Sequence, residues 1–345
     1  MGADEVNLIS LESLRVDYPI GGSVFKTAKT LRAVDGVSLD IKKGEILGLV
    51  GESGCGKSTV GRAILRLIEP TAGRVLYKGI DLAGLSPSAM REQRKHLQII
   101  FQDPYASLNP RMSAGQIVGE PIRTFGLAKG KNVESMAGDL MESVGLERNL
   151  LTRYPREFSG GQRQRIGIAR ALAVNPEFIV ADEPISALDV SIQAQIMNLM
   201  KRLQTEKNLT YLFISHDLRA VRHLADRIAV MYLGRVIELA DGAEIYDAPL
   251  MPYTRALIAA VPVPDPKVES RRNRAILKGD VPSPIEPPSG CHFRTRCQYA
   301  INDCSLIVPQ LIEIKTRHRA ACIRISAENP DIEANAKAGL GAVGN

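Results

Sequence analysis

The sequence predicts an α/β fold, followed by a small C-terminal module rich in proline and cysteine. Apolar stretches of strand length alternate with helical stretches from about residue 31 to residue 239, which is the pattern of an α/β domain. After Asp241 frequent prolines interrupt any long element. We therefore expect a main domain over residues 1–240, a C-terminal extension over residues 241–326 and a loose tail over residues 327–345.

The composition predicts a folded protein that does not cross a membrane. The chain has 345 residues, of which 45% are hydrophobic, enough for one large domain and a smaller appendage. Its longest apolar stretches, such as residues 46–50 and 178–181, are far shorter than the roughly 18 residues of a membrane-spanning helix. The first ten residues lack the basic start and apolar run of a secretory signal. We therefore expect the protein to stay in the cytosol.

The basic net charge does not predict a nucleic-acid partner. The formal charge is +6 and the pI is about 9.0, but the charged residues are spread along most of the chain. Aromatic residues make up 5% and tryptophan is absent from the sequence, which argues against a surface that stacks bases. We expect no nucleic-acid binding.

Residues 51–58, with the sequence GESGCGKS, match a phosphate-binding loop between a strand and a helix. Glycines in such a loop let successive backbone N–H groups point at phosphates, and the following helix adds its positive dipole end. Lys57 should meet the β and γ phosphates, and the Ser58 hydroxyl should bind Mg²⁺. Cys55 occupies a variable position of the motif, so we expect no redox role for it. The expected nucleotide contacts of this segment are Ser53, Gly54, Cys55, Gly56, Lys57, Ser58 and Thr59.

Two carboxylates follow the apolar stretch 178–181, as a nucleotide-hydrolysing site requires. Asp182 should hold Mg²⁺ through its water shell. Glu183 points the other way in an extended chain and should reach the attacking water as a general base.

A third motif distinguishes this chain from a generic nucleotide kinase. Ser159, Gly160, Gly161 and Gln162 precede a helix and form a second helix terminus suited to an anion. One nucleotide site needs only one such loop, so the second predicts a partner that brings another nucleotide to it.

These motifs resemble those of the ABC ATPases, whose signature motif looks like residues 159–162. That family has a P-loop fold with a RecA-like core, an antiparallel β subdomain and a helical subdomain. The resemblance implies a glutamine loop at Gln102 that senses Mg²⁺, an interface residue at Asp189 and a γ-phosphate contact at His216. It also implies an aromatic residue that stacks on adenine, for which Tyr18 is the candidate and Phe25 the alternative.

Within the ABC ATPases, the sequence resembles most the ATPase subunits of dipeptide and oligopeptide importers. Residues 101–110 (FQDPYASLNP) and the Pro-Tyr-Thr run at 252–254 carry this resemblance, although Met251 and Ile185 depart from the usual His and Thr. It implies ATP hydrolysis with Mg²⁺, a related but different second ATPase subunit, two membrane permease subunits and an external substrate-binding protein. The chain would lie on the cytoplasmic face of the bacterial inner membrane, and the segment 21–29 favours the second ATPase of such a pair.

Four cysteines lie close together near the C-terminus. They are Cys291, Cys297, Cys304 and Cys322, separated by five, six and seventeen residues. Four thiolates can hold a [4Fe–4S] cluster or a tetrahedral Zn²⁺ ion. The wide gaps favour the cluster over zinc, and members of the resembling branch have this cysteine set. Four reduced thiols that pack a small apolar module remain the alternative, and His292 or His318 could replace a cysteine.

Several functional alternatives stay open at the level of sequence. An ABC ATPase that acts on DNA or ribosomes would give the basic pI a meaning, but it predicts a second cassette or a long coiled-coil insertion, and the sequence has neither. A regulatory subunit that binds nucleotide without hydrolysis is disfavoured by Glu183 and by the signature motif. Dipeptides, longer peptides, murein fragments and nickel complexes are all compatible cargoes.

Overall fold

The computed structural model describes residues 7–21, 29–261, 277 and 279–338. By its internal contacts the chain divides into two compact units, and each unit is assembled from separate stretches of sequence. The first unit takes in Met1–Ser10, Asp40–Ile46 and Leu76–Ser215, and the second takes in Leu11–Leu39, Leu47–Val75 and His216–Asn345.

The core of the first unit is a parallel arrangement of three strands. β7 (Phe178–Asp182) pairs with β6 (Leu97–Ile100) on one side and with β8 (Thr210–Ser215) on the other. Every residue of β7 and β8 is buried, as expected for parallel strands that are covered on both faces. Asp182 and Ser215 therefore end buried strands whose carboxyl ends point the same way.

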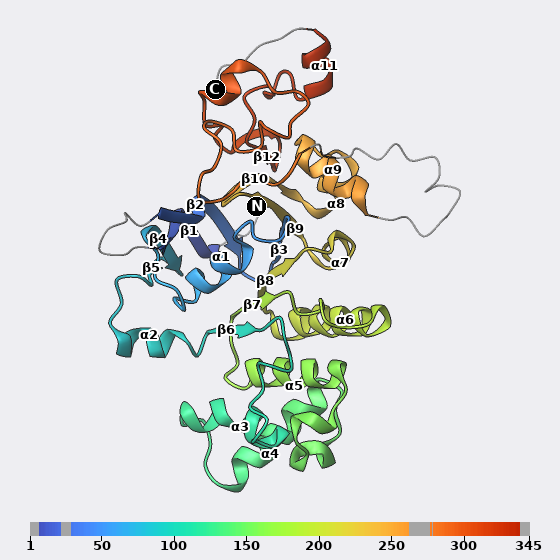
Figure 1. Cartoon of the computed structure of the whole chain (residues 1–345). Coiled ribbons are helices and arrows are strands. Elements are labelled where there is room, and N and C mark those ends of the chain that lie inside the picture. The colour runs from blue at the N-terminus through green and yellow to red at the C-terminus, as the bar shows by residue number, and fades with distance from the viewer. Residues whose placement is uncertain (1–6, 22–28, 262–276, 278, 339–345) are drawn as a thin grey trace, which may run out of the picture. The chain divides into compact units, whose positions relative to one another are not determined.

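Helices make up most of the remainder of the first unit. α3, α4 and α5 pack against one another, and Figure 1 shows them as a helical group. Ser113 and Ser159 start α3 and α5 with capping boxes, in which the side chains of Gln116 and Gln162 bond back to the cap. The elements of this unit other than the three core strands are β5 (Ile80–Asp81), α2 (Pro87–Gln93), α3 (Ala114–Thr124), α4 (Lys131–Ser143), η1 (Arg148–Thr152), η2 (Pro155–Glu157), α5 (Gly160–Leu172) and α6 (Val190–Lys207).

Strands that lie wholly or mostly in the second unit form two groups. In one group β2, β1 and β4 are neighbours in that order; in the other the order is β11, β12, β10, β9, β3. β3 and β9 are parallel. β10 pairs antiparallel with β9 on one side and with β12 on the other, and β12 pairs antiparallel with β11. The strands are β1 (Asn7–Ile20), β2 (Lys29–Lys42), β3 (Ile46–Val50), β4 (Ala72–Tyr77), β9 (Arg227–Tyr232), β10 (Arg235–Asp241), β11 (Ile312–Lys315) and β12 (His318–Ala320).

Helices of the second unit are short. α1 follows β3, and α9 begins with the Pro-Tyr-Thr run at its first turn. Among the residues of this unit that the structure describes, the helices are α1 (Lys57–Ile64), α7 (Leu218–Leu224), α8 (Gly242–Asp247), α9 (Pro252–Ala260), η3 (Asn302–Ser305) and α11 (Ile332–Lys337).

The helix α11 differs from the loose tail expected from residue 327. Asp331 caps its first turn, Ile332 is 1% exposed, and the buried Asn335 side chain donates to the Arg324 carbonyl at 2.7 Å. A buried apolar residue and a satisfied buried amide fix this turn to the preceding chain. Composition alone did not reveal these contacts.

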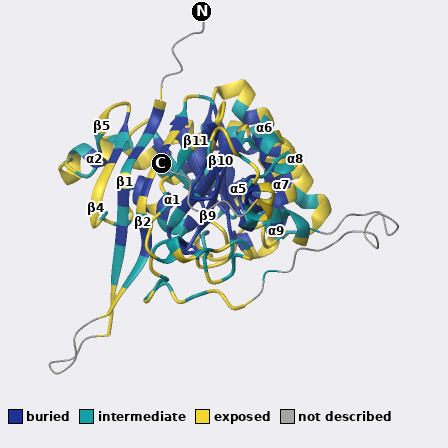
Figure 2. Cartoon of the chain, turned by 90° about the horizontal axis from the view of Figure 1, so that it is seen from above, coloured by how far each residue is buried: buried dark blue, intermediate teal, exposed yellow. Residues whose placement is uncertain are grey.

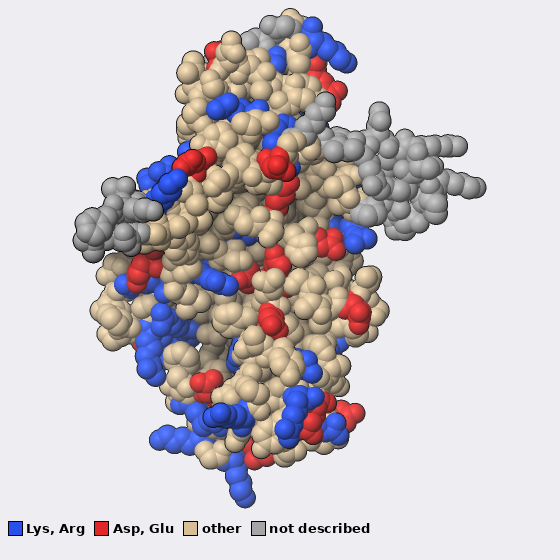
Figure 3. Space-filling view, viewed as in Figure 1, with Lys and Arg blue, Asp and Glu red and all other residues tan. Residues whose placement is uncertain are grey.

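Burial and charge follow the usual division between core and surface. Figure 2 shows the strands largely buried, whereas helices such as α2 and α6 carry exposed residues. Figure 3 shows lysines and arginines interspersed with acidic side chains in the upper, middle and lower parts of the visible face. Within the described residues, none of the helices is long and apolar enough to cross a membrane.

Candidate nucleotide site and cysteine pocket

The predicted nucleotide residues are divided between the two units. Tyr18, residues 53–59 and His216 belong to the second unit, whereas Gln102, residues 159–162, Asp182, Glu183 and Asp189 belong to the first. Each group has its own internal geometry.

The phosphate loop lies between β3 and α1, as the sequence predicts. A side chain at Gly51 would place its Cβ 2.2 Å from the Met231 carbonyl oxygen, and one at Gly56 would lie 2.1 Å from that of Ala33. Both residues also have positive φ, so only glycine fits. The backbone can therefore follow the tight curve that turns successive N–H groups toward a phosphate.

Lys57 is the positively charged group of this loop. Its side chain is 4% exposed, and its ammonium donates to the carbonyls of Gly51 at 2.9 Å and Glu52 at 3.0 Å. α1 begins at Lys57 with no acidic residue in its first turn. A buried cation at a helix N-terminus fits a polyphosphate ligand.

Cys55 is buried within the same loop. It is 4% exposed, and burial raises the pKa of its thiol. A raised pKa reduces the thiolate fraction of Cys55.

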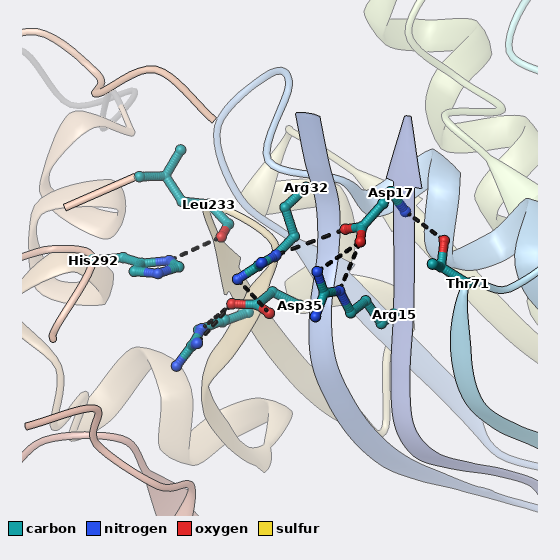
Figure 4. Close-up of polar contacts among 8 residues, drawn as sticks. Arg15, Asp17, Arg32, Asp35, Thr71, Leu233 and His292 are labelled. Carbon is teal, nitrogen blue, oxygen red and sulfur yellow. Dashed lines mark hydrogen bonds and ion pairs between the residues drawn. The ribbon is translucent and has the colours of Figure 1, made fainter. Parts of the chain in front are cut away.

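Two residues from the second unit are placed near the ends of strands. His216 is exposed and directly follows β8. Tyr18 is half-buried on β1, next to Asp17, whose carboxylate accepts from Arg15 at 2.8 Å and whose N–H donates to Thr71 at 2.9 Å (Figure 4). These bonds fix the backbone beside Tyr18. The alternative, Phe25, and most of the segment 21–29 lie outside the described residues.

In the first unit the structure brings Gln102 and Glu183 together. The Gln102 amide Nε2 donates to Glu183 Oε2 at 3.0 Å, and the Glu183 N–H donates to the Ile214 carbonyl at 3.0 Å. Glu183 has a φ of 46°, a left-handed conformation that is costly for a residue with a side chain and is concentrated at functional sites. Asp182, one residue earlier, is 1% exposed. The β7 end thus holds two carboxylates in different surroundings.

The signature residues form the start of α5. Ser159 Oγ accepts from the Gln162 N–H at 3.3 Å, and the Ser159 N–H donates to Gln162 Oε1 at 3.0 Å. Ser159 is exposed, so its hydroxyl proton can be donated to an outside acceptor. Asp189 is exposed at the start of α6 and makes no side-chain cap there.

The loop between Glu183 and Asp189 accommodates the unusual Ile185. This side chain is 2% exposed, and the Ile185 carbonyl accepts from Gln193 Nε2 at 3.1 Å. The buried side chain and the bonded carbonyl of Ile185 therefore hold this loop in place.

All four late cysteines line one pocket. Its lining also includes Phe293 and Ile332, and burial raises the pKa of the Cys297 thiol to about 11 and that of Cys322 to about 12. The four cysteines form no disulfide with each other, and Cys322 Sγ accepts from the Arg324 N–H at 3.4 Å. The sequence-distant thiols are thus brought to one place.

The geometry around this pocket does not match a single-ion site. Across the ranges that the structure describes, no three or more His, Cys, Asp or Glu residues are grouped closely enough to hold a metal ion. His292 and His318, considered as replacement ligands, are engaged elsewhere: His292 Nδ1 lies 3.1 Å from the Leu233 carbonyl oxygen, and His318 Nε2 lies 2.8 Å from Glu238.

Three residues near the phosphate loop were not singled out as site residues from the sequence. The Glu52 carboxylate pairs with Arg296, and the Glu52 N–H donates to the Tyr253 hydroxyl. In the sequence, Tyr253 could have been found through the Pro-Tyr-Thr run to which it belongs. Arg296 is marked in the sequence only by its position directly before Cys297.

Two family models match the chain. The ABC transporter family matches residues 34–186, and the family described as the C-terminal region of oligopeptide/dipeptide transporters matches residues 237–304.

Relatives with oligopeptide transport in their names are similar over most of this chain. The chain is 51% identical over 322 residues to AppF of Bacillus subtilis, named an oligopeptide transport ATP-binding protein, with 93% of this chain and 98% of AppF covered. It is 53% identical over 316 residues to YkfD of the same organism, covering 91% and 94% of the two chains.

Among solved structures, the chain is similar to the dimeric bacterial ABC transporter cassette MJ0796. The two share 32% identity with a TM-score of 0.61, over 68% of this chain and 98% of that one. The cassette cbiO1 of Clostridium perfringens gives 26% identity and the same TM-score, over 71% and 92%. The chain therefore belongs to the ATP-binding proteins of ABC transporters, within the oligopeptide and dipeptide transporter family.

Proposed function

We propose that this chain hydrolyses ATP to power the import of di- or oligopeptides, from the cytoplasmic face of the bacterial inner membrane. The similarity to AppF over almost the whole of both chains supports the cargo class. The hydrogen bond between Gln102 and Glu183 carries the hydrolytic part, because it holds a carboxylate in one orientation after a buried strand.

Nucleotide binding is assigned to the loop after β3. Backbone N–H groups of residues 53–59 and the Lys57 ammonium would contact the phosphates, and Tyr18 would stack on the adenine. Ser58, Gln102 and Asp182 would hold Mg²⁺, which neutralises phosphate charge when it is bound. An oxygen-rich donor set of this kind suits that ion.

Hydrolysis is assigned to Glu183 as the general base. Its carboxylate accepts a proton from the attacking water, whose oxygen bonds to the γ-phosphorus while the bond to the β-phosphate oxygen breaks. The Gln102 amide orients this carboxylate, and His216 would contact the γ-phosphate. The left-handed backbone of Glu183 contributes to the fixed direction of its side chain.

Coupling to transport requires a second cassette. Residues 159–162 and Asp189 of this chain would face a nucleotide held by a related but different ATPase subunit, and the partner would supply the same residues in return. Closure of the pair on ATP would switch two permease subunits between inward-open and outward-open states, and an external substrate-binding protein would deliver the peptide.

The test is transport and ATPase activity of the reconstituted complex with Glu183→Gln. Loss of the carboxylate removes the proton acceptor but retains the shape, so we expect ATP to bind and turnover to fall by about 10²-fold or more. Unchanged turnover would assign hydrolysis to the partner cassette alone and leave this site a regulatory one.

The same proposal assigns a [4Fe–4S] cluster to the cysteine pocket. Four thiols that line one pocket support it, as does the backbone N–H directed at Cys322. A cluster of four iron atoms is larger than one Zn²⁺ ion and therefore accepts thiolates that are farther apart. The cysteines would ligate the irons, and the cluster would stabilise the C-terminal residues.

Iron, sulfide and zinc contents of anaerobically purified protein distinguish these assignments. We expect about four irons and four sulfides per chain, and their loss in Cys322→Ser. Stoichiometric zinc without sulfide would show that the cysteines hold a Zn²⁺ ion and not a cluster. Metal-free protein of full stability would show that the thiols have a purely structural role.

A further inference from the structure

The phosphate loop contains a negative charge that the bound nucleotide would have to tolerate. Glu52 is the second residue of the loop, directly after Gly51, and its side chain is 26% exposed. Lys57 and the loop N–H groups attract phosphate, whereas a carboxylate at this position repels it. The loop therefore needs a compensating cation for Glu52.

Arg296 supplies that cation. Its Nη1 lies 2.8 Å from Glu52 Oε2 and its Nη2 lies 3.2 Å from Glu52 Oε1, so the ion pair is bidentate. The Arg296 side chain is only 7% exposed, so water screens the pair weakly. The two residues are 244 positions apart in sequence.

Aromatic packing holds Arg296 in place. Its guanidinium lies 6.0 Å from the centre of the Tyr232 ring. That ring packs edge-on against Tyr253 at 4.8 Å and Phe293 at 5.3 Å between centroids. The Tyr253 hydroxyl also accepts the Glu52 N–H at 2.9 Å. The backbone and the side chain of Glu52 are thus both held by residues from the C-terminal part of the chain.

A second link joins the same parts of the molecule. The Gly234 N–H donates to the Cys55 carbonyl at 2.9 Å, and the adjacent Leu233 carbonyl lies 3.1 Å from His292 Nδ1, as Figure 4 shows. The turn between β9 and β10 therefore bridges the phosphate loop and the cysteine-containing residues.

We propose that Arg296 is a positioning residue for nucleotide binding, which neutralises Glu52 and thereby sets the affinity of the phosphate loop for ATP. The proposal rests on the proposed function, in that it requires the loop to bind ATP. Because Arg296 directly precedes Cys297, the same ion pair joins the cysteine pocket to the nucleotide site.

A double-mutant cycle on the full chain tests this role. Affinity for a fluorescent ATP analogue with Mg²⁺ is measured for wild type, Arg296→Gln, Glu52→Gln and the double variant. We expect Arg296→Gln to weaken binding by about tenfold in the wild-type background and by less than about twofold in the Glu52→Gln background, because the carboxylate to be neutralised is then gone. Arg296→Lys keeps the charge and should recover most of the affinity.

Two further readouts separate positioning from simple loss of fold. In the reconstituted complex, Arg296→Gln should raise KM for ATP with little change in kcat. Arg317→Gln is the matched control, since Arg317 also pairs with a carboxylate, but that carboxylate, Asp241, is partly exposed and lies outside the loop at residues 51–58. The nucleotide affinity of this variant should equal that of the wild type.

An equal loss of affinity on removing Arg296 in both backgrounds would overturn the proposal, and so would an unchanged affinity of Arg296→Gln. Failure of the wild-type chain to bind the analogue would instead contradict the proposed function. The two failures are therefore distinguishable.

Discussion

Gly161 illustrates, at the scale of one residue, how tightly the signature helix is packed. A Cβ at this position would lie 2.5 Å from Cγ2 of Ile192 on α6. We expect Gly161→Ala to lower the free energy of unfolding by about 1–3 kcal/mol, because the helices α5 and α6 must move apart. Denaturant unfolding of the full chain measures the change.

Gly167, on the same helix, provides the control for that substitution. No atom lies within 4 Å of a Cβ built there, so Gly167→Ala should raise the free energy of unfolding by about 0.5–1 kcal/mol through helix propensity alone. Equal effects of the two substitutions would contradict the packing argument.

The sequence predicts the individual groups of the proposed nucleotide site, but it does not predict their conformations. A loop such as residues 51–58 is recognisable because its glycines and Lys57 have to stand at fixed spacing. By contrast, the positive φ of Glu183 and its bond with Gln102 depend on strands that meet only in the folded chain. No local sequence pattern predicts this conformation or this hydrogen bond.

At the scale of elements, a buried carboxylate joins β10, β12 and the start of α9. Glu238 is 0% exposed and accepts from the N–H groups of Leu250 at 2.6 Å and Met251 at 3.1 Å, with His318 Nε2 at 2.8 Å. We expect Glu238→Ala to destabilise the protein by about 3–5 kcal/mol, because buried polar groups lose their partner. Thermal unfolding monitored by circular dichroism would measure this.

Glu313→Ala serves as the control, since Glu313 is an exposed residue on the neighbouring β11. It should stay within about 0.5 kcal/mol of the wild type. A Glu238→Ala variant as stable as this control would show that the buried bonds contribute nothing net.

Element boundaries show where sequence reasoning reaches its limit. The apolar stretch at residues 46–50 forms β3, and the helix after the phosphate loop, α1, ends at Ile64, with Arg66 just beyond it at positive φ. The sequence alone did not fix this end. α6 runs to Lys207 and ends at Asn208 in the left-handed conformation. The short strands β11 and β12 and the helix α11 were not foreseen. β12 pairs with β10, far away in sequence, β11 pairs with β12, and α11 is fixed by the buried bond between Asn335 and Arg324.

At the scale of the whole molecule, the proposed assembly predicts that ATP drives this chain to pair with a different cassette. With Glu183→Gln to prevent turnover, we expect a one-to-one complex with the related second ATPase subunit in light-scattering measurements. Ser159→Glu should abolish this pairing, since a carboxylate at the exposed start of α5 would repel the partner's nucleotide.

ATP binding by the loop of the Ser159→Glu variant itself should persist in this experiment. An ATP-driven complex of this chain alone, of the same size, would argue for a homodimer. A complex that survives Ser159→Glu would mean that residues 159–162 do not face the partner's nucleotide.

The division into two units could not be read from composition along the chain. Prolines and cysteines mark a change after residue 241, yet by contact residues 47–75 belong with residues 216–345. Contacts such as that between Glu52 and Arg296 unite segments 244 positions apart, which a linear scan of the sequence does not detect.

That long separation has a consequence for biosynthesis. Glu52 is synthesised 244 residues before Arg296, so a nascent chain that has not yet reached Arg296 carries its phosphate loop without the countercharge. By the role proposed for Arg296, such a chain should bind ATP more weakly than a chain that includes Arg296.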